Sequence, residues 1–177
     1  LEETVAYPDG SPAFYFARLR YVDNIDEIFA AERAVRAVLQ EGTVNINGQE
    51  VGIRFSYLDA VSQSDTIRLI FDDDEYTYIK TLEDNPFIIE LTYPLPVTVN
   101  GFSLIIGSAN IRVMLTASGA PGAEPVTYTF EGKGSENEPE LSFDLPQPVN
   151  AQVLHIEVLD PFSPPPAQIH IWELTLR

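Results

Sequence analysis

The 177-residue chain has no cysteine, which excludes disulfide bridges, thiol nucleophiles and cysteine-ligated metal sites. Basic residues are scarce: 10 Lys and Arg stand against 27 Asp and Glu, and the net charge is −17. A field of this sign repels polyanions, so we expect no nucleic acid partner. A divalent cation or an uncharged sugar would not be repelled, and both remain open as ligands.

The chain also lacks an apolar run long enough to cross a bilayer and lacks a secretory leader, so we expect no membrane insertion by this fragment. It begins at Leu1, and we interpret it as a domain excised from a larger protein. Hydrophobic residues make up 45% and charged residues 21%, which is the balance of a chain that folds around a core. Its length suits one domain, or one domain with an appendage.

Motifs of catalysis and of nucleotide binding are missing too. The sequence contains no Gly-x-Ser-x-Gly elbow, no metalloprotease helix motif and no glycine-rich phosphate loop. The two histidines, His155 and His170, fall inside expected strands, where a lone histidine is more often structural than catalytic. We therefore expect that this chain is not an enzyme, although its parent protein can be one.

The N-terminal third predicts one helix and one hairpin. Residues 23–40 place apolar side chains at helical spacings, with Asp23 or Asn24 available as a cap and Gly42 as a stop. The apolar face of this helix could pack on the rest of the chain or dock a partner domain. Residues 43–57 read as two strands joined by Asn47-Gly48, a dipeptide that accepts the positive φ angles of a tight hairpin turn.

From residue 66 onward, short apolar or alternating runs predict strands separated by turn residues. The runs are TIRLIF, PFIIELT, VNGFSLIIG, IRVMLTAS, VTYTFEG, ELSFDL, AQVLHIEVL and QIHIWELTL. Most of the 14 prolines fall between Pro94 and Pro166, and we assign them to the connections because proline lacks the amide donor of a central strand.

These observations predict a mainly β fold. No helix-length pattern separates the runs, so we expect an antiparallel jelly-roll β-sandwich rather than a parallel sheet. The predicted organisation is a sandwich over residues 66–177, with the helix and hairpin of residues 1–65 packed on it as an appendage.

One segment, residues 67–81, resembles the loop of galactose-binding-like domains, the superfamily of discoidin (coagulation-factor C-type) domains and of many bacterial carbohydrate-binding modules. The matching residues are Phe71, the triplet 72–74, Thr77 and Tyr78. Asp73 stands where the family usually has glycine, which requires a backbone that tolerates a side chain there. Ile79 stands where the family usually has tryptophan.

The likeness continues in order through residues 86–91, 99–104, 112–119 and 151–160 to the closing strand, QIHIWELTL, and covers about residues 66–177. In the late strand, His155 stands where the family usually carries arginine. The resemblance implies a β-sandwich that binds carbohydrate. It leaves residues 1–65 without a counterpart.

The acidic loop is the candidate metal site. Four carboxylates occur at residues 72–75, and hard oxygen ligands at this density suit Ca²⁺. In many relatives a structural calcium is held in this loop; carried over by resemblance, its ligands are Asp72, Asp74, Thr77 and Glu173. The alternative is a solvated acidic turn, in a protein that is rich in carboxylates throughout.

Aromatic residues in loops are the candidate ligand contacts, because an aromatic ring stacks on a sugar face. Phe162, which precedes the closing strand, stands near the position where related sugar binders often place an aromatic residue. Tyr76 and Tyr57 are further candidates. The alternative for Phe162 is a ring packed over prolines to close the edge of the sandwich.

Together these features favour a non-catalytic accessory module of a larger extracytoplasmic protein, secreted or at the cell surface, that binds carbohydrate or glycan. The expected partners are a glycan or other domains of the parent protein, and the expected cofactor is a structural calcium. A structural or protein-interaction domain of a bacterial surface or membrane-anchored protein is the alternative, because fold resemblance alone does not settle function.

Overall fold

The structure, a computed structural model, describes the backbone of residues 3–6, 12–16, 24, 27–28, 38–57, 68–74, 76–81, 85–107, 110–119, 124–135, 139–163 and 169–177. Side chains are described for these residues except 3–6, 12–16, 38–40 and 55–57. Two compact units make up the chain, Leu1–Ala34 and Val35–Arg177. In the first, strands β1 (Glu3–Ala6) and β2 (Pro12–Phe16) form a two-stranded antiparallel sheet, which the sequence analysis did not predict.

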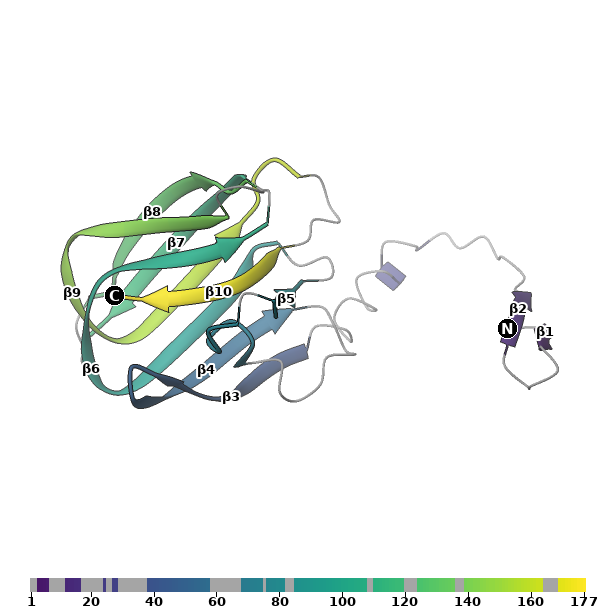
Figure 1. Ribbon diagram of the computed structural model, residues 1–177, viewed down its shortest axis with the longest axis horizontal. Coiled ribbons are helices and arrows are strands. Elements are labelled where there is room, and N and C mark those ends of the chain that lie inside the picture. Colours follow the sequence, from purple (N-terminus) through teal and green to yellow (C-terminus); the bar gives the residue numbers. More distant parts are fainter. Residues whose placement is uncertain are drawn as a thin grey trace. The chain divides into compact units, whose positions relative to one another are not determined.

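The second unit is an antiparallel β-sandwich, as the sequence predicted, and it contains eight strands (Figure 1). The strands are β3 (Val38–Ile46), β4 (Gln49–Tyr57), β5 (Ile79–Lys80), β6 (Phe87–Ile106), β7 (Asn110–Ser118), β8 (Val126–Lys133), β9 (Glu140–Leu159) and β10 (His170–Leu176). They pair in the order β3-β4-β6-β9-β7-β8, and β10 pairs with β6 and β5.

The hairpin at 43–57 is confirmed. Asn47 and Gly48 have φ angles of 52° and 80°, and the Gly48 N–H donates to Asn45 Oδ1 at 3.0 Å. Strand β4 also pairs with β6, so the hairpin belongs to the sandwich itself. The compact unit therefore begins at Val35, well before the predicted boundary at residues 65/66.

The predicted helix at 23–40 is wrong at its C-terminal end. Residues 38–40 lie in β3 and pair with residues 55–57 of β4. The hairpin ladder therefore includes residues whose apolar spacing had suggested a helix. Near the predicted start, the Ile28 N–H donates to the Asn24 carbonyl at 3.1 Å. The rest of the predicted helix lies outside the described residues.

Strands β6 and β9 are 20 residues long and take part in both layers of the sandwich. The first part of β6 pairs with β4 and with the end of β9, whereas its last part pairs with β10 and with the start of β9. The β6–β9 ladder is interrupted between Thr92 and Val97. Both strands curve around the sandwich (Figure 1).

Prolines lie at both interruptions of this ladder. Pro94 and Pro96 fall between Thr92 and Val97 of β6, and Pro146 and Pro148 of β9 fall in a second gap, opposite the shift between Val99 and Gly101; a proline has no N–H to donate to a ladder. Our assignment of these prolines to connections was wrong: they mark the bends at which two long strands pass from one layer to the other. Four predicted runs are thereby merged into two strands. The run TIRLIF is also not a strand where it is described, since residues 68–70 form a 3₁₀ and turn segment.

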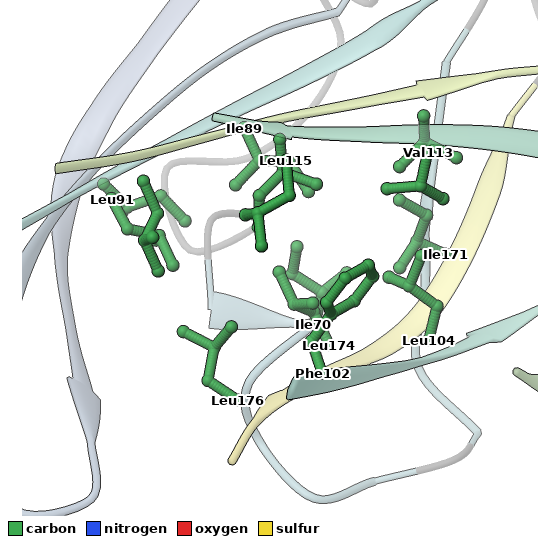
Figure 2. Packing of buried hydrophobic residues seen from close by; sticks show 14 of the residues in the cluster. Ile70, Ile89, Leu91, Phe102, Leu104, Val113, Leu115, Ile171, Leu174 and Leu176 are labelled. Atoms are coloured by element: carbon green, nitrogen blue, oxygen red, sulfur yellow. The ribbon is translucent and has the colours of Figure 1, made fainter. Parts of the chain in front are cut away.

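One hydrophobic core fills the space between the layers. Figure 2 shows Ile89 and Leu115 of one layer facing Phe102, Leu104 and Leu174 of the other. The buried positions of β6 change from odd to even numbers near Asn100, where the register shifts between Val99 and Gly101. This bulge lets one strand face the same core from both layers.

Candidate functional site

The acidic loop is held by its own side chains. Asp73 has a φ of 58°, so an aspartate does occupy the left-handed conformation expected where relatives have glycine. Asp72 Oδ1 accepts the Asp74 N–H at 3.1 Å, and Asp74 Oδ1 accepts the Tyr76 N–H at 2.9 Å. The loop is therefore a fixed turn, because its carboxylates bind its own backbone.

Thr77 gathers several oxygen atoms. Its Oγ1 lies 3.1 Å from both carboxylate oxygens of Asp72, 3.0 Å from the Asp74 carbonyl and 3.4 Å from the Leu69 carbonyl. A hydroxyl group has one hydrogen to donate, so it cannot satisfy all of these acceptors at once. Oxygen atoms that lie close together and have unused lone pairs are the ligands that Ca²⁺ coordinates.

Glu173 is buried in β10, with 8% of its surface exposed. The next residue, Leu174, donates its N–H to the Ile70 carbonyl at 2.8 Å, which ties the closing strand to the segment before the acidic loop. Within the described residues, however, no three His, Cys, Asp or Glu side chains are grouped so as to hold a metal ion. The oxygen atoms that the structure does bring together are the Asp72 carboxylate, the Thr77 hydroxyl and main-chain carbonyls.

The aromatic candidates have different settings. Tyr76 is 94% exposed and Phe162 is 76% exposed, so neither ring is buried as an edge closure would require. The side chain of Tyr57 lies outside the described residues. Phe162 and Tyr76 are thus two aromatic side chains open to a ligand.

A network of hydrogen bonds fixes the Phe162 loop. Asp160 Oδ1 accepts the N–H groups of Phe162 and Ser163 at 2.9 and 3.1 Å, and Asp160 Oδ2 accepts the Ser163 hydroxyl at 2.7 Å. Burial alone would raise the pKa of the Asp160 carboxyl, but these hydrogen bonds outweigh it and hold the pKa below its usual value. The Phe162 ring therefore extends from a preformed loop.

Sequence reasoning missed a cluster of aromatic rings formed by Tyr78, which directly precedes β5, and by His170 and Trp172 of β10. The ring of Tyr78 lies 5.2 Å from that of Trp172 and 5.8 Å from that of His170. Burial lowers the pKa of the His170 imidazole, and the charge of Lys80 lowers it further. The alternation of His170 and Trp172 in the closing strand was the available signal for this cluster.

The other histidine, His155, lies on the outer face of the sandwich. Its Nε2 is 3.2 Å from Glu157 Oε1, and its Nδ1 is 3.8 Å from Glu90 Oε2. Glu90 also accepts an ion pair from Arg54 at 3.6 Å, and Arg54 pairs with Glu41 at 3.1 Å. His155 thus continues a row of polar side chains that contact one another across neighbouring strands, which is a structural role.

Comparison with known proteins identifies the fold. No protein-family model matches the sequence, and no curated protein matches it. Among solved structures, the F5/8 type C domain of a Bacteroides fragilis protein is similar with a TM-score of 0.58 and 16% identity, over 77% of this chain and 95% of that chain. A CBM32 module produced by Clostridium perfringens is similar with a TM-score of 0.54 and 11% identity, over 72% of this chain and 92% of that chain.

A third similar structure is a GH29 fucosidase from Ruminococcus gnavus, with a TM-score of 0.58 and 11% identity over 71% of this chain. The chain spans 24% of the length of that fucosidase. The β-sandwich fold predicted from the sequence is therefore confirmed, because the chain is similar in fold to the F5/8 type C domain and to the CBM32 module. Among the described residues, no helix is long and apolar enough to cross a membrane.

Proposed function

We propose that the chain is a non-catalytic carbohydrate-binding module of a larger extracytoplasmic protein. The observation that carries the proposal is Phe162, whose ring is 76% exposed on a loop fixed by Asp160. A sugar offers a C–H face that packs on an aromatic ring, and a preformed loop has little conformational freedom to lose on binding.

The structural neighbours support this proposal. The similar module from Clostridium perfringens is a carbohydrate-binding module, and the likeness to 24% of a fucosidase chain agrees with a module carried by a larger protein. Tyr76 provides a second exposed ring, and Tyr57 stays a prediction. The net charge of −17 favours glycans without negative charge.

A glycan array tests the proposal with two matched variants. Phe162→Ala should weaken binding by about tenfold or more, because a tenfold loss corresponds to about 1.4 kcal/mol, which is within reach of one stacked ring. Leu95→Ala is the control, since Leu95 is also an exposed apolar side chain, at 70%, and should leave binding unchanged. A wild-type protein that binds no array glycan above background would contradict the proposal and favour the structural or protein-interaction role.

We also propose that a structural Ca²⁺ binds at the acidic loop. The crowded oxygen atoms around Thr77 Oγ1 support this, and their residues would hold the ion: Asp72 through its carboxylate, Thr77 through its hydroxyl and Asp74 through its carbonyl. The buried Glu173 is the remaining candidate ligand. A bound ion would offset part of the negative charge of the loop and join it to β10.

A further inference from the structure

A cleft of about 410 Å³ lies between the β3–β4 hairpin and the acidic loop. Its volume is within the range of roughly 300–1,000 Å³ that small-molecule sites occupy. Its polar and aromatic lining comprises Thr43, Asn45, Glu50, Arg68, Phe71 and Asp72. It has neither Phe162 nor Tyr76 in its lining, so it is separate from the exposed rings described above.

The hairpin register forms one wall of the cleft. Asn45 lies directly opposite Glu50, and Thr43 lies opposite Gly52. Because side chains alternate along a strand, Thr43 and Asn45 project from the same face. Gly52 adds no side chain opposite Thr43, which leaves this face of the hairpin open. Among the described strands β3 pairs with β4 alone, so its far edge has backbone groups that no neighbouring strand uses.

On the opposite wall of the cleft, Arg68 differs from the other arginines whose side chains are described. The other arginines with described side chains are ion-paired, Arg54 with Glu41 at 3.1 Å, Arg112 with Glu131 at 2.8 Å and Arg177 with Asp144 at 3.1 Å. Within the described residues, Arg68 is in no ion pair, although Glu50 and Asp72 line the same cleft. In a chain with a net charge of −17, its guanidinium is a set of planar donors still available to a ligand.

The lining matches the chemistry of a sugar. Sugar hydroxyls both donate and accept hydrogen bonds, and the cleft offers donors on Arg68 and on the side-chain amide of Asn45 and an acceptor on Glu50. Phe71 is partly buried and packs against the core, so its ring is a fixed apolar surface. An acidic sugar would be repelled, because the cleft has two carboxylates, of Glu50 and Asp72, and one guanidinium, of Arg68. The cleft therefore favours an uncharged glycan.

We infer that this cleft is a second glycan site, which takes a short uncharged oligosaccharide and is distinct from the Phe162 loop. The inference rests on the proposed function and deepens it. A module with two separate sites would hold a polysaccharide at two points, and its avidity would exceed the affinity of either site.

Two variants separate the sites. Thr43→Trp fills the cleft with a residue that a β-strand accepts readily, and Phe162→Ala removes the exposed ring. The probes are lactose, cellobiose, maltose and xylobiose, titrated against labelled protein while NMR follows the side-chain N–H signal of Arg68 and the backbone N–H signals of Thr43 and Asn45, which remain in every cleft variant that leaves those residues in place. Thermal unfolding shows that each variant is folded. Arg68→Ala is the second cleft variant, for use if Thr43→Trp does not fold.

We expect at least one disaccharide to shift the Arg68 signal, Phe162→Ala to preserve this shift, and Thr43→Trp or Arg68→Ala to weaken binding at the cleft by about tenfold. Binding that leaves Arg68 unchanged and disappears in Phe162→Ala would overturn the second site and leave the proposed function intact. Absence of binding to all four disaccharides would overturn the second site as well, whereas the proposed function fails only if the glycan array is also negative.

Discussion

Asn85 and Asp160 are joined by two reciprocal hydrogen bonds. The Asn85 side-chain amide donates to the Asp160 carbonyl at 2.7 Å, and the Asp160 N–H donates to Asn85 Oδ1 at 2.9 Å. The two residues are 75 positions apart, and they connect the segment before β6 to the segment after β9. The loop that presents Phe162 is therefore anchored to the sandwich at its first residue.

Asn85→Ala should lower the free energy of unfolding by about 1–3 kcal/mol, because it leaves partly buried groups without partners. It should also weaken glycan binding, since the Phe162 loop loses its anchor. Asn150→Ala is the control: Asn150 also accepts a side-chain hydrogen bond, from Thr98 at 2.8 Å, but at an exposed position. Urea denaturation of both variants measures the difference. Equal effects would show that the Asn85–Asp160 pair has no special part in stability.

Low pH should release the Phe162 loop. The hydrogen bonds to Asp160 lower the pKa of its carboxyl in the folded protein, so the folded state binds this proton less readily than the unfolded state. The resulting stability is fully present above the unfolded pKa of about 3.9. It is lost as the pH falls through the lower, folded pKa.

Melting temperatures of the wild type and of Asp160→Asn, recorded from neutral to strongly acidic pH, check this expectation. The variant should melt at a lower temperature at neutral pH, and the difference should shrink in the acidic range. A difference that stays constant with pH would contradict the role of the charged Asp160 carboxylate.

Calcium should raise the melting temperature of the wild type relative to excess EDTA. A ligand that binds only the folded state adds about 2.7 kcal/mol at a concentration one hundred times its dissociation constant. Asp72→Asn and Thr77→Val should each reduce the effect, because they remove oxygen ligands or charge at the crowded site. Glu124→Gln removes an exposed carboxylate elsewhere and should leave it unchanged. If calcium has no effect on the wild type, the loop is a solvated acidic turn.

Gly101→Ala should destabilise the sandwich, because the new Cβ would collide with the Phe143 carbonyl oxygen on the neighbouring strand. We expect a loss of about 1–3 kcal/mol, as for an overpacked core position. Gly52→Ala is the matched control, since its Cβ would meet nothing closer than the Thr92 carbonyl oxygen at 3.6 Å, and its cost should be within about 1 kcal/mol. Chemical denaturation compares the two, and similar losses would contradict the steric explanation.

The sequence predicted features that depend on local backbone chemistry. The Asn47-Gly48 turn and the left-handed Asp73 were both expected, because short-range sterics determine which residues accept a positive φ. The prediction for residues 38–40 failed because periodicity alone does not tell a short apolar strand from the end of a helix. Tertiary pairing with β4 decides that segment.

Features that depend on register were beyond the sequence. In β10 the pairing shifts between Ile171 and Glu173, and the bulge leaves Glu173 and Leu174 both buried, against the alternation of an ordinary strand. The cleft was equally hidden, because it needs the hairpin and the segment around Arg68 to lie close in space. No local pattern encodes such a contact between distant segments.

The two long strands give the sandwich a mechanical property. Because β6 and β9 each run through both layers, neither layer can separate while the other stays intact. The unit should therefore unfold as a whole rather than one layer at a time. If the chain is carried as a module in a larger protein, a pulling force would pass through the continuous backbone of these two strands, and the loops at the ends of the sandwich would keep their shape until the entire fold unfolds.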